Sequence, residues 1–182
     1  MNFLGLHVVA SIVQMAYFKM AFGVGQAFSE LWSLSSRRSA LAYRLAHSLD
    51  LPAHQAHTVA LFIDAGRMVM SHEPRYREMF LSRPGEQAMA TFERDLFGCT
   101  SQDVTSLMAK RWGLAGPVMS VLSGERDSTE AGTLGQLLDL AHAVAVNDEI
   151  PEHALEVAAA TFGRPSVVVQ ERLARLGDLS TE

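Results

Sequence analysis

Apolar side chains recur every three to four positions through most of this chain, and prolines and glycines interrupt the pattern at short intervals. This is the period of an α-helix with one buried face. The pattern is clearest between Pro52 and Ser71, where proline stands at a first helical position that needs no N–H partner. No alternating β-branched run of strand length occurs, and there is no internal repeat. The sequence therefore predicts an all-α fold in one domain.

The breaks divide the chain into a series of predicted helices. They cover residues 26–49, 52–71, 75–82, 85–97, 104–112, 117–122, 134–145, 152–162 and 165–176. Thr100 to Asp103 has the spacing of a capping box, in which side chains satisfy the free amides of a helix start. Ser123 to Thr133 is the loosest stretch and is predicted to be a loop.

Composition excludes several classes of function but does not identify one. A chain of 182 residues fits one domain, and its one cysteine, Cys99, forms no internal disulfide, which suits a reducing, cytoplasmic compartment. The net charge of −5 argues against a nucleic-acid-binding surface. No Walker motif, GxGxxG, GxSxG, HExxH or paired CxxC occurs, so we expect no cofactor.

The segment from Phe3 to Phe22 is apolar enough to raise the question of a membrane span. Polar residues nevertheless recur along one side of the helix that it would form, which favours a packed helix over a spanning one. The apolar side is predicted to bind a protein partner or a second copy of the chain. Its residues are Leu4, Val8, Ile12, Met15 and Phe18.

Short motifs then follow one another in a distinctive order over roughly residues 4–160. They are Leu4-Gly5-Leu6, Leu31-Trp32 with Ser35, Leu45-Ala46, the turn Leu49-Asp50-Leu51-Pro52, Ala60 to Arg67, Phe92-Glu93 to Gly98, Lys110 to Leu114, and Pro151 to Leu155. In this order they resemble the HDOD domain, a degenerate relative of the HD metal-dependent phosphohydrolases found in bacterial signalling proteins. The resemblance implies a single multi-helix HD-like orthogonal bundle and a regulatory role through protein–protein interaction.

One departure from the family concerns the start of the chain. Family members usually carry a helical N-terminal half before the Leu-Gly-Leu helix, whereas Met1 here lies almost on that motif. We therefore expect that half to be absent and the first helix to need a covering partner. The expected layout is an apolar linking helix over residues 1–25, an HD-like core over 26–162, and a terminal helix and tail over 163–182.

A second departure concerns metal. At the positions of the catalytic ligands, this chain offers Leu34, Ile63-Asp64, Ser101, Ser123-Gly124 and His142. Asp64 alone keeps the expected residue type, although His142 could also ligate. The resemblance thus implies a pseudo-enzyme, because catalytic metal sites need several converging donors.

The alternative is a divalent-metal-dependent phosphohydrolase with a reduced site. It would use Asp64 and His142 with one or more of His47, His54 and His57. His54 and His57 stand three positions apart, but the simpler interpretation is a solvated pair, since real sites add a third ligand. The simpler interpretation of Asp64 is an i,i+3 ion pair with Arg67.

Two further groups of charged residues have a functional and a structural interpretation. Arg37, Arg38 and Arg44 form a basic stretch that could contact a phosphate or a nucleotide second messenger, although no glycine-rich cradle supports this and a solvated face is the default. Glu93 is expected to contact solvent or the neighbours of Arg94, because it does not face Asp95 on a helix.

Overall fold

The computed structural model describes residues 20, 25–114, 116–147 and 152–177. Every regular element in these ranges is a helix, which confirms the predicted all-α bundle. The described part of the chain contains no helix that is both long and apolar enough to cross a membrane. The predicted partner-binding residues Leu4, Val8, Ile12, Met15 and Phe18 lie outside the described residues.

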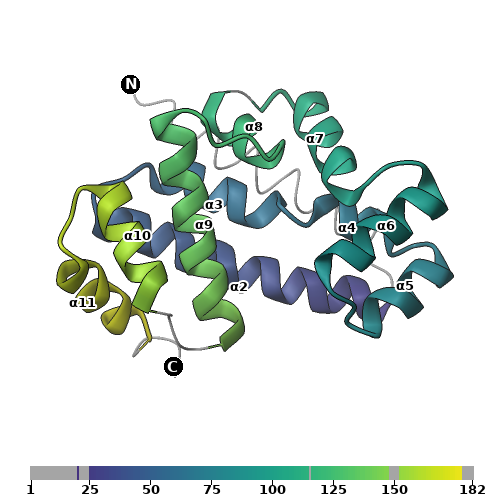
Figure 1. Ribbon diagram of the computed structural model, residues 1–182, viewed down its shortest axis with the longest axis horizontal. Coiled ribbons are helices and arrows are strands. Elements are labelled where there is room, and N and C mark those ends of the chain that lie inside the picture. The colour runs from purple at the N-terminus through teal and green to yellow at the C-terminus, as the bar shows by residue number, and fades with distance from the viewer. Residues whose placement is uncertain (1–19, 21–24, 115, 148–151, 178–182) are drawn as a thin grey trace.

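The larger part of the bundle is built on α2 (Gln26–Ser48), which packs along α3 (Ala53–Phe62) and is crossed by α9 (Thr129–Asn147) (Figure 1). Helices α8 (Gly116–Leu122), α10 (Glu152–Phe162) and α11 (Ser166–Gly177) complete it. Apolar residues spaced at helical intervals meet in one core, where each fully buried leucine contributes roughly 1.5–3 kcal/mol. They include Leu45, Val59, Phe62, Leu122, Leu134, Leu137 and Leu140.

The smaller part consists of α4 (Ala65–Met70), α5 (Pro74–Leu81), α6 (Glu86–Phe97) and α7 (Ser101–Arg111), on the right of Figure 1. Met70, Tyr76 and Met89 form its own apolar cluster. The predicted capping box at the start of α7 is present, with Thr100 and Asp103 exchanging hydrogen bonds. Ala65 and Met68 of α4 and Ala109 of α7 also belong to the main core, so the two parts pack directly against each other.

Glu93 departs from its predicted exposure. Its side chain is buried, and it accepts hydrogen bonds from the Tyr76 hydroxyl at 2.8 Å and from the Ser101 backbone N–H at 2.7 Å. The first N–H groups of a helix lack partners within the helix, so the start of α7 attracts a carboxylate. Glu93 thereby joins α5, α6 and α7.

The single helix predicted over 52–71 is wrong, because it breaks into α3 and α4 at Ile63 and Asp64. The Thr105 hydroxyl of α7 enters this break. It accepts a hydrogen bond from Gly66 N at 2.9 Å, in the place of a carbonyl of the preceding turn. A side chain inserted into the ladder of backbone hydrogen bonds is a known cause of sharp helix kinks. The break turns the Asp64 side chain towards α2.

Gly66 explains how α7 approaches the break so closely. A Cβ atom added at Gly66 would overlap the Ser101 carbonyl oxygen, which is backbone and cannot move aside. Only glycine fits there, because helices approach at this distance where one of them lacks a side chain. The position of Asp64 therefore depends on the contact between α4 and α7.

Candidate functional site

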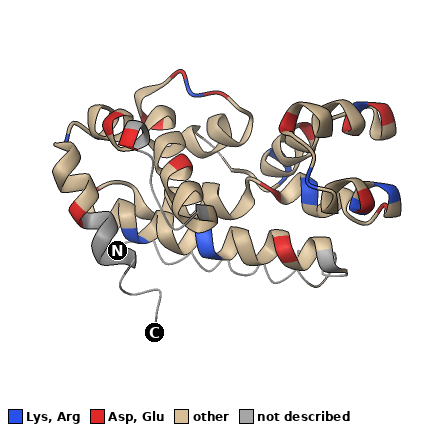
Figure 2. Ribbon diagram, turned by 60° about the horizontal axis from the view of Figure 1, so that its bottom comes forward, with Lys and Arg blue, Asp and Glu red and all other residues tan. Residues whose placement is uncertain are grey.

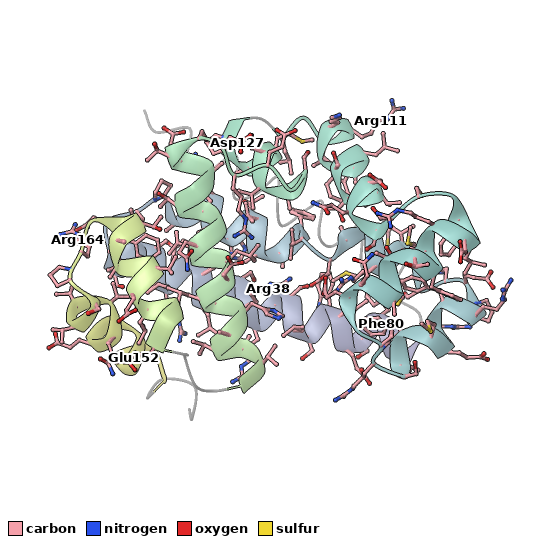
Figure 3. All side chains as sticks on the ribbon, viewed as in Figure 1. Arg38, Phe80, Arg111, Asp127, Glu152 and Arg164 are labelled. Carbon is pink, nitrogen blue, oxygen red and sulfur yellow. The ribbon has the colours of Figure 1, made fainter. Side chains whose placement is uncertain are left out.

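A cleft of about 370 Å³ opens where the two parts of the bundle meet. It lies between α2, the α3–α4 break, the starts of α6 and α7, the loop before α9, and α9 itself. Figure 3 shows Arg38 near the centre of the molecule, where α9 crosses α2. The polar residues that line the cleft are Arg38, Asp64, Arg67, Glu86, Ser101, Gln102, Arg126, Asp139 and His142.

Arg38 forms the floor of the cleft. Its side chain is 3% exposed, and its Nη2 donates to Asp64 Oδ2 at 2.7 Å and to Ser35 Oγ at 3.2 Å. Nε donates to the Ala60 carbonyl at 3.0 Å, and Nη1 lies 3.4 Å from His142 Nδ1. A buried charge requires this degree of pairing, since the cost of removing it from water is large.

Asp64 is held in its ionised form by the arginines around it. Burial on its own would raise the pKa of the Asp64 carboxyl, but the charges of Arg38 and Arg67 and the hydrogen bond from Arg38 outweigh it, so the pKa lies below its usual value. The Asp64–Arg67 pair predicted from the sequence is present at 3.7 Å. The closer partner is Arg38.

His142 lies on α9 and faces the same guanidinium. A guanidinium has only donors, so Nδ1 must act as the acceptor and the ring proton of the neutral form is on Nε2. Partial burial of the ring and the neighbouring charge of Arg38 lower the pKa of His142. Arg38 therefore lies between the two residues that the sequence nominated as relic ligands.

Two further ion pairs stand at the mouth of the cleft. Arg67 Nη2 donates to Glu86 Oε1 at 3.0 Å, and Arg126 forms a bidentate pair with Asp139 at 2.5 and 3.0 Å. Both carboxylates are far more exposed than Asp64: the Glu86 and Asp139 side chains are 88% and 48% exposed. The mouth is thus lined by paired charges in contact with solvent.

The predicted basic stretch is not one surface. Arg37 and Arg44 are exposed on α2, whereas Arg38 is buried, so its inclusion in a solvated face was wrong. The sequence did contain a signal for this, because Leu31, Arg38 and Leu45 recur every seven positions and therefore share the inward face of the helix. An anion contact at Arg37 and Arg44 stays a prediction.

The three other candidate histidines lie together, but not in the cleft. The rings of His47, His54 and His57 surround Tyr43, with centroid distances of 6.2, 5.5 and 6.3 Å. None of them lines the cleft that Asp64 and His142 share. Within the described ranges, no group of three or more His, Cys, Asp or Glu side chains is placed to hold a metal ion.

Sequence reasoning missed Glu86, Arg126 and Asp139 altogether. Arg126 comes from the stretch predicted as a loop, and nothing near it in sequence indicates that it meets α9, which begins at Thr129 rather than at 134. The three residues lie in different segments, and only the packing of α6 and α9 brings them to one cleft.

Charge elsewhere on the molecule is mixed. In Figure 2, acidic and basic residues are interspersed over the part formed by α5 and α6, and no large face of one sign is apparent in this view. The cleft therefore differs from the rest of the molecule in its buried ion pairs, and not in a large surface of one charge.

A sequence model of the HDOD domain matches residues 1–127 of this chain. This chain belongs to the HDOD domain family. The match covers the α3–α4 break and Arg38, and it ends before α9, which carries Asp139 and His142. No curated protein matches the chain.

Two solved structures share the fold of this HDOD protein. The MmoQ response regulator from Methylococcus capsulatus str. Bath matches with a TM-score of 0.65 and 19% identity, over 82% of this chain and 62% of MmoQ. A "Putative phosphohydrolase" from Shewanella amazonensis SB2B matches with a TM-score of 0.63 and 15% identity, over 96% of this chain and 70% of that one. This chain thus spans less than two thirds of MmoQ, and both likenesses concern the helical fold.

Proposed function

We propose that this HDOD protein is a non-catalytic signalling module that acts by binding another protein. The observation that supports the absence of catalysis is the position of Arg38. Its buried guanidinium bonds Asp64 and faces His142, the two side chains that a reduced metal site would have to use. A cationic side chain thus stands where the donors converge.

A divalent cation would meet three obstacles in this arrangement. The Asp64 oxygen nearest the cleft floor already accepts a hydrogen bond at 2.7 Å. The His142 nitrogen that faces inward lies against Arg38. The guanidinium also carries a positive charge and would repel a second cation at short range. These donors do not fit a bound metal.

The competing proposal, a metal-dependent phosphohydrolase with a reduced site, is favoured by one fact: Asp64 and His142 do line one cleft. Purified protein would be assayed with p-nitrophenyl phosphate and its bis-ester in Mg²⁺, Mn²⁺ and Co²⁺. We expect no metal-dependent hydrolysis. Hydrolysis that Asp64→Asn abolishes, and that the exposed control Asp95→Asn leaves intact, would overturn the non-catalytic proposal.

The protein-binding half of the proposal rests on the apolar side of the first segment, with Ile12 and Met15 at its centre. Burial of an apolar stripe of this kind against another protein favours association. Light scattering should give a mass above that of one chain, alone or with a partner. Ile12→Asp with Met15→Asp should abolish the association, whereas Gln14→Asp, on the polar side, should preserve it. Unchanged association in the double variant would contradict this surface.

A further inference from the structure

The two arginines at the mouth of the cleft make contacts besides those with Glu86 and Asp139. Arg67 is 28% exposed, and most of its side chain is covered where α4 meets the rest of the cleft. Arg126 lies against Gly135 of α9, where a Cβ atom would come within 2.8 to 2.9 Å of its guanidinium and its stem. Because α9 has no side chain there, the Arg126 side chain lies flat on the helix.

The carboxylates at the mouth are less firmly held. Glu86 is the first residue of α6, and most of its side chain is in water. Asp139 is about half exposed. Exposed ion pairs contribute little to stability, so each carboxylate can turn into solvent at small cost. Asp64 cannot do so, because it is buried against Arg38.

If the two carboxylates turn away, the mouth presents the guanidinium groups of Arg126 and Arg67. Arg67 keeps its contact with Asp64 at 3.7 Å, and the Arg38–Asp64 pair lies below them. Gln102 and His142 line the same space and add neutral hydrogen-bonding groups. Planar guanidinium groups bind phosphate oxygens in pairs, which gives both charge neutralisation and orientation. The cleft, at about 370 Å³, is the size of a small-molecule site.

We propose that this cleft binds the phosphate group of a small molecule, held by Arg67 and Arg126 in place of Glu86 and Asp139. Glu86 and Asp139 occupy the same guanidinium groups when the ligand is absent and so compete with it. The inference rests on the proposed function in one respect, namely that the ligand is bound and not hydrolysed. The phosphate ligand of the cleft is distinct from the protein partner that is proposed to bind the first segment.

The test is calorimetric titration of the full chain with inorganic phosphate and with pyrophosphate, at constant ionic strength adjusted with chloride. Saturable binding of at least one of them is expected. Arg67→Gln and Arg126→Gln should each weaken it by about tenfold or more, because each removes charge-assisted hydrogen bonds. Glu86→Gln and Asp139→Asn should strengthen it by about two- to fivefold, because each removes a weak exposed competitor.

Matched control variants distinguish anion binding in the cleft from nonspecific attraction of anions to charged residues elsewhere on the protein. Arg111 and Glu152 are exposed residues that do not line the cleft, and Figure 3 shows both far from Arg38. Arg111→Gln and Glu152→Gln should leave the affinity unchanged, and thermal melting should show that every variant is folded. No saturable binding of either anion would overturn the proposal, as would equal weakening by Arg111→Gln.

The outcome also separates this inference from the proposed function. Metal-dependent hydrolysis of phosphoesters with anion binding intact would contradict the non-catalytic proposal alone. Absence of both hydrolysis and anion binding would contradict only the phosphate site.

Discussion

The floor and the mouth of the cleft contain the same chemistry in different surroundings. Arg38–Asp64 and Arg126–Asp139 are both short arginine–carboxylate pairs, at 2.7 Å and at 2.5 Å. The side chains of the first pair are 3% and 10% exposed, whereas those of the second are 44% and 48% exposed. Distance therefore does not distinguish them, and burial does: a buried charge cannot lose its partner without a large cost, while an exposed one returns to water.

The largest loss of stability is expected when the Arg38–Asp64 pair at the floor of the cleft is broken. Arg38→Met leaves the Asp64 carboxylate buried without its main partner, and it also leaves the Ala60 carbonyl without a donor. We expect the free energy of unfolding to fall by about 3–5 kcal/mol. Urea denaturation followed by circular dichroism measures it.

The double variant Arg38→Met with Asp64→Leu sharpens this prediction. Replacing a whole buried pair by apolar residues of similar volume is often neutral, so most of the lost stability should return. A double variant as unstable as Arg38→Met would mean that the pair is not the cause, and that Arg38 acts through its packing alone.

The next comparison is between Gly66, beside the α3–α4 break, and Gly135, which lies against Arg126. An added Cβ at Gly66 meets backbone, whereas at Gly135 it meets the flexible end of Arg126. Gly66→Ala should therefore destabilise the protein by about 1–3 kcal/mol, since α4 and α7 must move apart. Gly135→Ala should stabilise it by up to about 1 kcal/mol, because alanine favours a helix interior and Arg126 can turn aside. This prediction would be contradicted by thermal melts in which both variants shift the melting temperature in the same direction.

Acid titration tests the floor in another way. The pKa of Asp64 is lower in the folded chain than the usual 3.8. The unfolded state therefore binds its proton first, so the stability from ionised Asp64 is present above pH 3.8 and is lost as the pH falls through the folded-state pKa. The difference in unfolding free energy between wild type and Asp64→Asn should shrink as the pH is lowered. A difference independent of pH would show that the carboxylate charge contributes nothing.

These contacts also show what the sequence could and could not reveal. Helices, the capping box and the Asp64–Arg67 pair depend on residues a few positions apart, whose geometry follows from the helical period. Arg38 and Asp64 are 26 positions apart, and Arg38 and His142 are 104 apart. Such pairs form only when packing fixes how the helices cross.

The α3–α4 break illustrates the same limit. The apolar period continues through Ile63 and Gly66, so local reasoning predicts one helix. The break depends on the Thr105 hydroxyl, which is 39 positions away from the amide that it bonds. Asp64 was singled out by its position in the motif and does line the cleft, but its partner Arg38 could not be identified from its neighbours in the sequence.

The smallest loss of stability is expected when the Arg126–Asp139 pair at the mouth of the cleft is broken. Arg126→Gln removes a bidentate ion pair, yet both partners are about half exposed and become hydrated when separated. The free energy of unfolding should fall by less than about 1 kcal/mol, and the loss should shrink further in about 1 M salt, where the screening length is about 3 Å. A loss as large as that of Arg38→Met would show that the loop before α9 depends on this pair, and that Asp139 is not free to yield Arg126 to an incoming anion. A small, salt-sensitive loss is the behaviour that a displaceable carboxylate requires.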